Sequence, residues 1–279
     1  MKVTLLHNTP LWINAHGART CWNSGDKSDS VESEFGICGI KDAELIDRVG
    51  NKFKHASVLE HVSYNFHIKG ISRALLQELA RHRIASLSVK STRYTLKELK
   101  EEQIRLENDP VTSVNGWNYQ TIKKYCVLPD ADDDTIIHLG SALWSIQKKL
   151  LDGKSNDRVK YLLPEAYKTE LTWTINMRSL QNFLLLRSDK SALWEIRNLA
   201  NAIYEALPEE HKYMYENQMK FTRDEEEEYN RNLKLLEEAK KPTKEIRTRY
   251  YEETGEMNSD ENIMLWWTVR QAKEFTKHM

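Results

Sequence analysis

Two clusters of basic and hydrogen-bonding residues in the sequence have the chemistry that a phosphate requires. The first lies within residues 81–93, which contain no acidic residue. Its basic members are Arg81, His82, Arg83, Lys90 and Arg93, and its hydroxyl groups come from Ser86, Ser88, Ser91 and Thr92. One charge-assisted hydrogen bond is worth roughly 1.5–3 kcal/mol, so two or three that converge can hold a nucleotide phosphate. The alternative is a basic helix end that faces water and complements its own dipole.

The second cluster lies at the junction between a predicted strand and a predicted helix. It consists of Asn176, Arg178, Asn182 and Arg187. Arg178 and Asn182 are four positions apart, so they share one face of a helix. Because the adjoining residues 183–186 are apolar, the cluster favours a buried polar network or a ligand site. Helix capping and surface solvation are the alternative.

The spacing within the first cluster resembles a known motif. Arg81, His82 and Arg83 are followed, after seven residues, by Ser91. This RHR-x7-S pattern resembles the signature of the flavin-dependent thymidylate synthases, and four fixed residue types at fixed spacing rarely occur together by chance. Segments 18–21, 55–61, 176–187 and 194–196 also resemble that family, in the same order. The resemblance extends from residue 1 to roughly residue 215.

The resemblance implies an enzyme that converts dUMP to dTMP. Members of this family use FAD as cofactor, methylenetetrahydrofolate as carbon donor and NADPH as reductant, and they need no protein nucleophile. The cofactor then supplies the difficult chemistry, while the protein supplies placement and electrostatics. The resemblance also implies a homotetramer with its sites at subunit interfaces.

The resemblance assigns one group of residues to dUMP. They are Glu78, Arg81, Lys90, Ser91, Thr92, Arg93, Lys160 and Arg187. Arg187 is the expected catalytic residue, because a fixed cation at the uracil edge stabilises the anion that forms when N3 loses its proton. Lys160 stands where relatives often carry Arg, and Lys lacks the bidentate fork of a guanidinium. A second departure is Val89, which stands where relatives commonly have Glu or Gln.

A partly overlapping group is assigned to FAD. It comprises Cys21, His55, Ser57, Arg81, His82, Arg83, Asn176, Arg178 and Asn182. In the family, a small polar residue meets the flavin at the position of Cys21. No residue is expected to bind a metal.

Other chemistries fit the residues of these clusters less well than nucleotide and flavin binding. Ser91 could be a nucleophile activated by His82, but no G-x-S-x-G elbow surrounds it and the neighbouring cations suit a phosphate better. His55, His61 and His67 could suggest a metal, yet on a strand His61 and His67 would lie about 20 Å apart. The classical thymidylate synthases, which use no flavin, need a catalytic cysteine, and none of the three cysteines in this sequence has such a context. An inactive family member that serves in assembly is a further alternative, because of Val89.

Composition argues against several classes of protein. The formal net charge of −1 provides no global field that would attract nucleic acid. The longest apolar stretch, residues 263–269, is far too short to span a bilayer. Three widely separated cysteines without a CxxC pair argue against a disulfide framework or a structural zinc site. We therefore expect a soluble cytoplasmic protein without nucleic-acid or membrane partners.

Mixed strand and helix patterns place the two clusters in an α+β fold with a mixed or antiparallel sheet. Alternation predicts strands near residues 1–12, 62–68 and 171–175, with Gly70 ending the second. Helical periodicity predicts helices near residues 43–53, 71–83, 178–186 and 191–207, the last capped by Ser191 or Asp189. Residues 17–33 are predicted as a loop and residues 103–134 as a surface excursion. Trp144, Trp173 and Trp194 are expected in the core.

The chain is expected to contain one catalytic domain, residues 1–217, and an extension, residues 218–279. The extension is rich in charged residues, which is typical of a solvated helix and a linker. Trp266 and Trp267 are expected to pack back on the assembly, since an exposed Trp pair promotes association.

Overall fold

The computed structural model describes residues 1–34, 36–102, 116–128, 132–220, 244–255, 258–259 and 262–264. Its contacts divide the chain into two units, Met1–Lys220 and Phe221–Met279. In the second unit, the helix α13 (Lys244–Thr254) contains most of the described residues. Trp266 and Trp267 lie outside the described residues.

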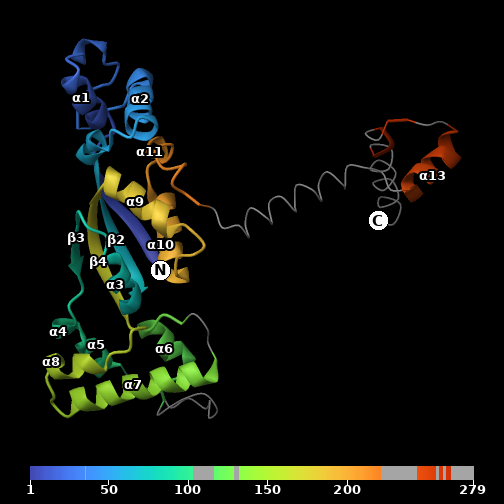
Figure 1. Ribbon diagram of the computed structural model, residues 1–279. Coiled ribbons are helices and arrows are strands. Elements are labelled where there is room, and N and C mark those ends of the chain that lie inside the picture. Colours follow the sequence, from blue (N-terminus) through green and yellow to red (C-terminus); the bar gives the residue numbers. More distant parts are fainter. Residues whose placement is uncertain are drawn as a thin grey trace. The chain divides into compact units, whose positions relative to one another are not determined.

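Unit 1 is built on a four-stranded sheet in which every neighbouring pair is antiparallel (Figure 1). The strands are β1 (Lys2–Asn8), β2 (Ser63–Ser72), β3 (Ala85–Val89) and β4 (Lys168–Asn176), in the spatial order β1-β2-β4-β3. The predicted α+β class is confirmed. The prediction that Gly70 ends the second strand was wrong, because β2 continues to Ser72. Gly70 has a φ of +75°, which accommodates a register shift between Lys69 and Ile71.

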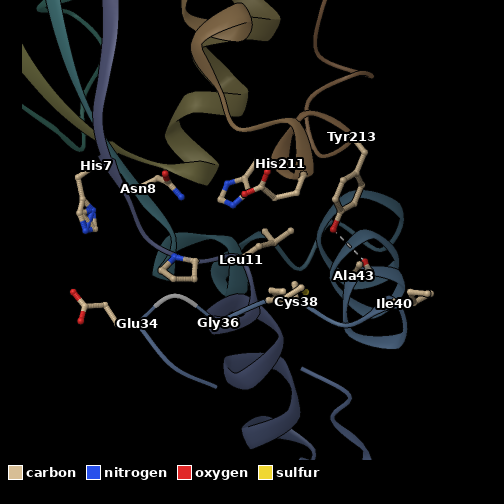
Figure 2. Close-up of a pocket in the computed structure, with 13 residues that line it drawn as sticks. His7, Asn8, Leu11, Glu34, Gly36, Cys38, Ile40, Ala43, His211 and Tyr213 are labelled. Atoms are coloured by element: carbon tan, nitrogen blue, oxygen red, sulfur yellow. Dashed lines mark hydrogen bonds between the residues drawn. The ribbon is translucent and has the colours of Figure 1, made fainter. Parts of the chain in front are cut away.

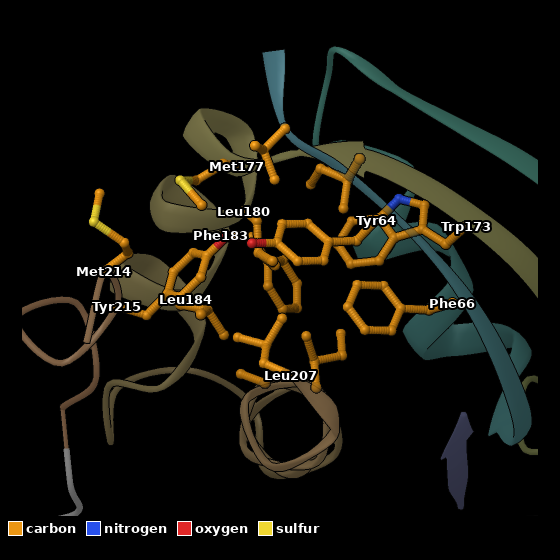
Figure 3. Packing of buried hydrophobic residues seen from close by; sticks show 14 of the residues in the cluster. Tyr64, Phe66, Trp173, Met177, Leu180, Phe183, Leu184, Leu207, Met214 and Tyr215 are labelled. Atoms are coloured by element: carbon orange, nitrogen blue, oxygen red, sulfur yellow. The ribbon is translucent and has the colours of Figure 1, made fainter. Parts of the chain in front are cut away.

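The main core lies between this sheet and two helices, α9 (Met177–Arg187) and α10 (Trp194–Ala206). Alternate residues of β2 and β4 point into it, among them Tyr64, Phe66 and Trp173, which are fully buried. Trp173 meets Phe183 of α9 edge to face, with ring centroids 5.1 Å apart (Figure 3). These aromatic contacts fix α9, and with it the second polar cluster, on the sheet.

The remaining helices of the main core are short. They are α1 (Trp12–Cys21), η1 (Gly25–Lys27), α2 (Ile40–Ile46), the π-helix η2 (Asp47–Lys52), η3 (Ala56–His61), α3 (Arg73–Leu79) and α11 (Glu209–Lys212). The prediction of a loop from residue 17 was wrong, since α1 continues to Cys21. Helix α10 begins at Trp194 without a side-chain cap, and Asp189 instead accepts hydrogen bonds from the backbone and hydroxyl of Ser191.

A second hydrophobic cluster lies beyond one end of the sheet, opposite to the end at which α1 and α2 lie (Figure 1). Its elements are α4 (Thr92–Thr95), α5 (Lys97–Glu101), α6 (Tyr119–Tyr125), α7 (Asp133–Leu151), α8 (Asn156–Val159) and η4 (Lys160–Leu162). The predicted surface excursion was wrong where it is described, because Trp117 is fully buried and Asp132 caps α7. Trp173 lies in the core as predicted, but Trp194 is 42% exposed.

Candidate functional site

The Arg81–Arg83 segment forms the turn between α3 and β3. Ser72 is the N-cap of helix α3, where its hydroxyl accepts the Leu75 N–H at 2.9 Å. Buried Glu195 of α10 accepts the Ser72 N–H and hydroxyl at 2.8 and 2.5 Å. After the turn, Ile84 has a φ of +60°. That conformation is costly for a β-branched residue, about 1–3 kcal/mol, and such strain is concentrated at functional sites.

His82 and Arg187 meet at the centre of this region, although 105 positions separate them in the chain. The Nε of Arg187 donates to the Nε2 of His82 at 2.9 Å, and the His82 ring packs edge to face on Phe183 at 4.9 Å. Burial, followed by the charges of Arg187 and Arg81, lowers the pKa of His82 to about 4. His82 is therefore a neutral acceptor at pH 7. It holds one edge of the guanidinium and leaves the terminal amino groups of Arg187 available to a ligand.

Glu78 has a buried carboxylate oxygen that lacks a hydrogen-bond partner within the described part of the chain. Glu78 lies in the last turn of α3, and its Oε2 is buried without a hydrogen-bond partner among the described residues. Buried polar atoms nearly always have a partner, so this orphaned acceptor fits a donor on a bound molecule. The Arg81 N–H donates to the Glu78 carbonyl at 3.2 Å, which links Glu78 to the motif.

The second half of the motif follows β3. The Lys90 backbone N–H donates to the Glu170 carbonyl, and the Lys90 Nζ lies 3.0 Å from a Glu98 carboxylate oxygen. Ser91 is the N-cap of α4, where its Oγ accepts the Arg93 N–H at 3.3 Å. No hydrogen bond joins Ser91 to an imidazole in the described chain, so the geometry does not support Ser91 as a nucleophile.

Arg93 and Lys160, both predicted to bind dUMP, converge on one carboxylate. Arg93 Nε lies 3.3 Å from Asp157 Oδ1, and Lys160 Nζ lies 3.5 Å from the same oxygen. The Asn156 side chain also donates to the Arg93 carbonyl at 2.7 Å. The sequence analysis missed Asp157, although its position three residues before Lys160 in a short helix was a usable signal. Thr92 follows the Ser91 cap directly.

Three of the residues predicted to bind FAD, Asn176, Arg178 and Asn182, lie at the cap and in the first turns of α9. Asn176 caps this helix by accepting the Ser179 N–H at 2.8 Å, and Arg178 forms an exposed ion pair with Glu60 at 2.6 Å. That ion pair links α9 to η3, whose segment contains Ser57 and follows His55. Ser57, Asn182 and Arg83 are exposed. Helix capping, the alternative for the Asn and Arg cluster, therefore holds for Asn176. Asn182 of the same cluster is exposed and can contact a ligand.

The predicted residues do not all meet within one chain. Cys21, at the end of α1, and the segment of His55 lie beyond one end of the sheet, and Arg93 and Lys160 lie beyond the other (Figure 1). Arg81, His82 and Arg187 lie between them. The Val89 backbone pairs with Leu171 in the sheet, and its side chain is exposed.

A cavity of about 720 Å³ contains none of the predicted site residues (Figure 2). Cys38 and His211 line it. Burial raises the pKa of the Cys38 thiol to about 11, so the thiolate that a cysteine nucleophile requires is absent at neutral pH. Burial lowers the pKa of His211 to about 4, and its ring is hydrogen-bonded to the Tyr64 hydroxyl at 2.8 Å. His211 therefore serves the core rather than a thiol.

The described residues contain no group of three His, Cys, Asp or Glu side chains that could hold a metal ion. None of their helices has both the length and the apolar character needed to cross a membrane.

Known proteins resemble this chain over unit 1. The family model described as "Thymidylate synthase complementing protein" matches residues 4–211. The flavin-dependent thymidylate synthase of Wolinella succinogenes is 58% identical over 215 residues, which cover 77% of this chain and 97% of that protein. The enzyme of the same name from Campylobacter jejuni is 54% identical over 219 residues, with 77% and 96% coverage.

A solved structure shares the fold. It is the crystal structure of thymidylate synthase X from Helicobacter pylori with FAD and dUMP, which is 46% identical with a TM-score of 0.69. The match covers 79% of this chain and all of that one. With Arg81–Arg83 on the turn between α3 and β3, with Ser91 at the cap of α4, and with these relatives, the chain belongs to the flavin-dependent thymidylate synthase family.

Proposed function

We propose that the chain converts dUMP to dTMP, with FAD as cofactor, methylenetetrahydrofolate as carbon donor and NADPH as reductant. The observation that carries the proposal is the hydrogen bond that joins Arg187 to His82 of the RHR-x7-S motif. When bound, the flavin supplies the redox chemistry and the transfer of the one-carbon unit. The chain's own residues bind the nucleotide, orient it and stabilise charge on the uracil.

Arg187 is the catalytic residue of the proposal. Its Nε is held by neutral His82, so the remaining N–H groups can point at the uracil edge. A fixed cation there stabilises the uracil anion formed when N3 loses its proton, because the guanidinium needs no reorientation during the reaction. Phe183 supports this arrangement by packing on the His82 ring.

The dUMP phosphate is assigned to the cap of α4 and its neighbours. Ser91, Thr92 and Arg93 would hold it through hydroxyl, backbone and guanidinium groups, with Lys90 and Lys160 adding positive charge. Asp157 lies within ion-pair distance of both Arg93 and Lys160. Glu78 would accept a hydrogen bond from the nucleotide, which satisfies its orphaned Oε2, and Arg81 would contact both nucleotide and flavin.

The FAD site is assigned to Cys21, His55, Ser57, Arg81, His82, Arg83, Asn176, Arg178 and Asn182. The exposed Arg178 and Asn182 share one face of α9 and offer hydrogen bonds to the flavin. This face and the cations of the motif turn fit an anionic dinucleotide.

We further propose a homotetramer whose sites lie at subunit interfaces. The separation of Cys21 and His55 from Arg93 and Lys160 supports it, since a second copy could bring the two groups together. The free state of Cys21, Cys38 and Cys126 is typical of a reducing compartment, so we propose the cytoplasm as location. The proposed domains are residues 1–217 for catalysis and 218–279 as the extension.

The first test is an absorbance spectrum of the purified full-length chain, followed by titration with dUMP. We expect flavin bands that shift on addition of dUMP, because both ligands would share one site. Turnover with NADPH and methylenetetrahydrofolate then measures dTMP directly. A chain that binds no FAD, even when FAD is added, would overturn the proposal. A chain that binds FAD and makes no dTMP would favour a family member that serves only in assembly.

A further inference from the structure

Another cavity lies among the N-terminal helices of unit 1. It encloses about 430 Å³, a volume typical of pockets for small organic molecules. Apolar side chains of α1, α2 and η2 form part of its lining, namely Ala18, Leu45 and Val49. The other lining residues are Arg19, Trp22, Ser24, Lys27, Arg48, Phe53 and His55. Of these, only His55 belongs to the site assigned above.

The charge of this cavity is positive. No acidic residue lines it, and Lys27 and Arg48 are exposed, with no ion pair to any carboxylate in the described part of the chain. Arg19 is different, because its Nε donates to Asp42 at 2.5 Å and its charge is compensated. Two cations without counter-charges at one cavity favour an anionic ligand.

The cavity also exposes two large aromatic side chains. Trp22 is 81% exposed and Phe53 is 63% exposed. Phe53 meets the His55 ring edge to face, with ring centroids 6.5 Å apart. Exposed aromatic faces beside unpaired cations fit a planar ring that carries phosphate or carboxylate groups.

The backbone around the cavity is irregular where these side chains project from it. Asn23 and Lys54 have φ values of +48° and +56°, and they directly follow Trp22 and Phe53. Arg48 belongs to η2, and π-helical turns are frequently found at functional sites. The left-handed conformation of Lys54 carries a cost, which supports a role for this turn in binding.

We propose that this cavity binds a cosubstrate of the reaction, with the planar ring stacked on Trp22 and Phe53 and the anionic group held by Lys27 and Arg48. The inference rests on the proposed function, which requires NADPH and methylenetetrahydrofolate. Both molecules combine aromatic rings with anionic groups, as phosphates in the first and glutamyl carboxylates in the second. The experiment below distinguishes these two sources of the same chemistry.

The test is calorimetric titration of the FAD-loaded full chain with NADP⁺ and, separately, with 5-formyltetrahydrofolate. The variants are Lys27→Gln, Arg48→Gln and Trp22→Ala, all at exposed positions. Lys52→Gln is the matched control, because Lys52 is also on η2 but pairs with Asp47 and does not line the cavity. FAD content, dUMP affinity and oligomeric state are measured on each variant.

We expect each of the three variants to raise the Kd of the same one of the two probes about five- to tenfold, as loss of a charged or stacking contact predicts. The Lys52→Gln control should change neither Kd by more than about twofold. The probe that loses affinity identifies the cosubstrate. FAD content and the dUMP titration should stay unchanged.

Three results would overturn the proposal. Unchanged affinity for both probes in all three variants would remove the cavity from binding. Loss of FAD in these variants, with probe affinity intact, would assign the cavity to the flavin. Dissociation of the assembly by Trp22→Ala would assign it to a subunit interface. Absence of dTMP formation in the unmodified chain is a separate outcome, because the titrations measure binding without turnover.

Discussion

Arg19 is buried and Arg187 is half-buried, and the two arginines differ in the charge of their surroundings. Arg19 is 8% exposed and bonded to Asp42, whose other oxygen accepts hydrogen bonds from Ser28 and Ser30. Burial alone would raise the pKa of Asp42, but these hydrogen bonds and the Arg19 charge lower it below its ordinary value. Arg187 instead meets neutral His82 and has no ion pair in the described residues.

The difference separates a structural charge from one that is available for function. A buried cation with a bonded carboxylate is complete, and removing its partner destabilises the fold. A cation held by a neutral acceptor keeps its full charge, which an anionic ligand or an anion formed during the reaction can neutralise. The same reasoning separates Arg19 from its neighbour Arg48 in the N-terminal cavity.

The largest expected effect on stability concerns Asp42. Asp42→Ala should lower the free energy of unfolding by about 3–5 kcal/mol, because it leaves Arg19 buried without a counter-charge. Urea unfolding followed by circular dichroism measures the change. Asp42→Asn, which keeps a hydrogen-bond acceptor, should lose less. Equal stability of Asp42→Ala and the unmodified chain would remove the distinction between the two arginines.

Arg187→Ala, in contrast, should strongly reduce activity and change stability little. We expect kcat to fall about 10²–10³-fold, the usual effect of removing one fixed donor from a developing anion. Bound FAD should remain largely in place, and the urea midpoint should change little, since no ion pair is lost. Turnover and the flavin spectrum are measured on the same sample. Full activity of this variant would remove Arg187 from the mechanism.

The third prediction concerns the acid side of the pH range. The pKa values of His82 and His211 are about 4 in the folded chain, below the ordinary 6.5. The unfolded chain therefore binds more protons, so stability is complete above pH 6.5 and is lost as the pH falls toward 4. Urea unfolding at a series of pH values measures this slope. His82→Gln should reduce it while keeping an acceptor for Arg187, and an unchanged slope would contradict the neutral state of His82.

The smallest effect is expected at the two cations that pair with Asp157. Lys160→Arg should lower the KM for dUMP by about two- to threefold, because it restores a bidentate fork at the phosphate. Arg93→Gln should instead raise the KM for dUMP and leave the FAD content unchanged. If neither substitution moves the KM for dUMP, the phosphate is bound elsewhere.

Local patterns predicted several elements of the fold, although they missed the long helix α7. Alternation in β2 and β4 and the apolar periodicity of α9 and α10 were sufficient, because their burial repeats along the chain. Strand β3 was not predicted, since serines alternate with Ala85, Leu87 and Val89 on an edge strand that is half exposed. Helix α1 was missed because Gly17 and a polar composition masked it; the Gly17 side of α1 lies close to the His61 ring.

The sequence by itself determined the chemistry: the RHR-x7-S spacing, the Asn and Arg cluster before residue 187, and the family they indicate. Only the tertiary structure decided which residues meet. The bond between His82 and Arg187 and the shared carboxylate of Arg93 and Lys160 join residues far apart in the chain. They depend on how β3 pairs with β4 and how helices pack at the two ends of the sheet. No local pattern encodes such contacts, because they arise only when distant segments are buried together.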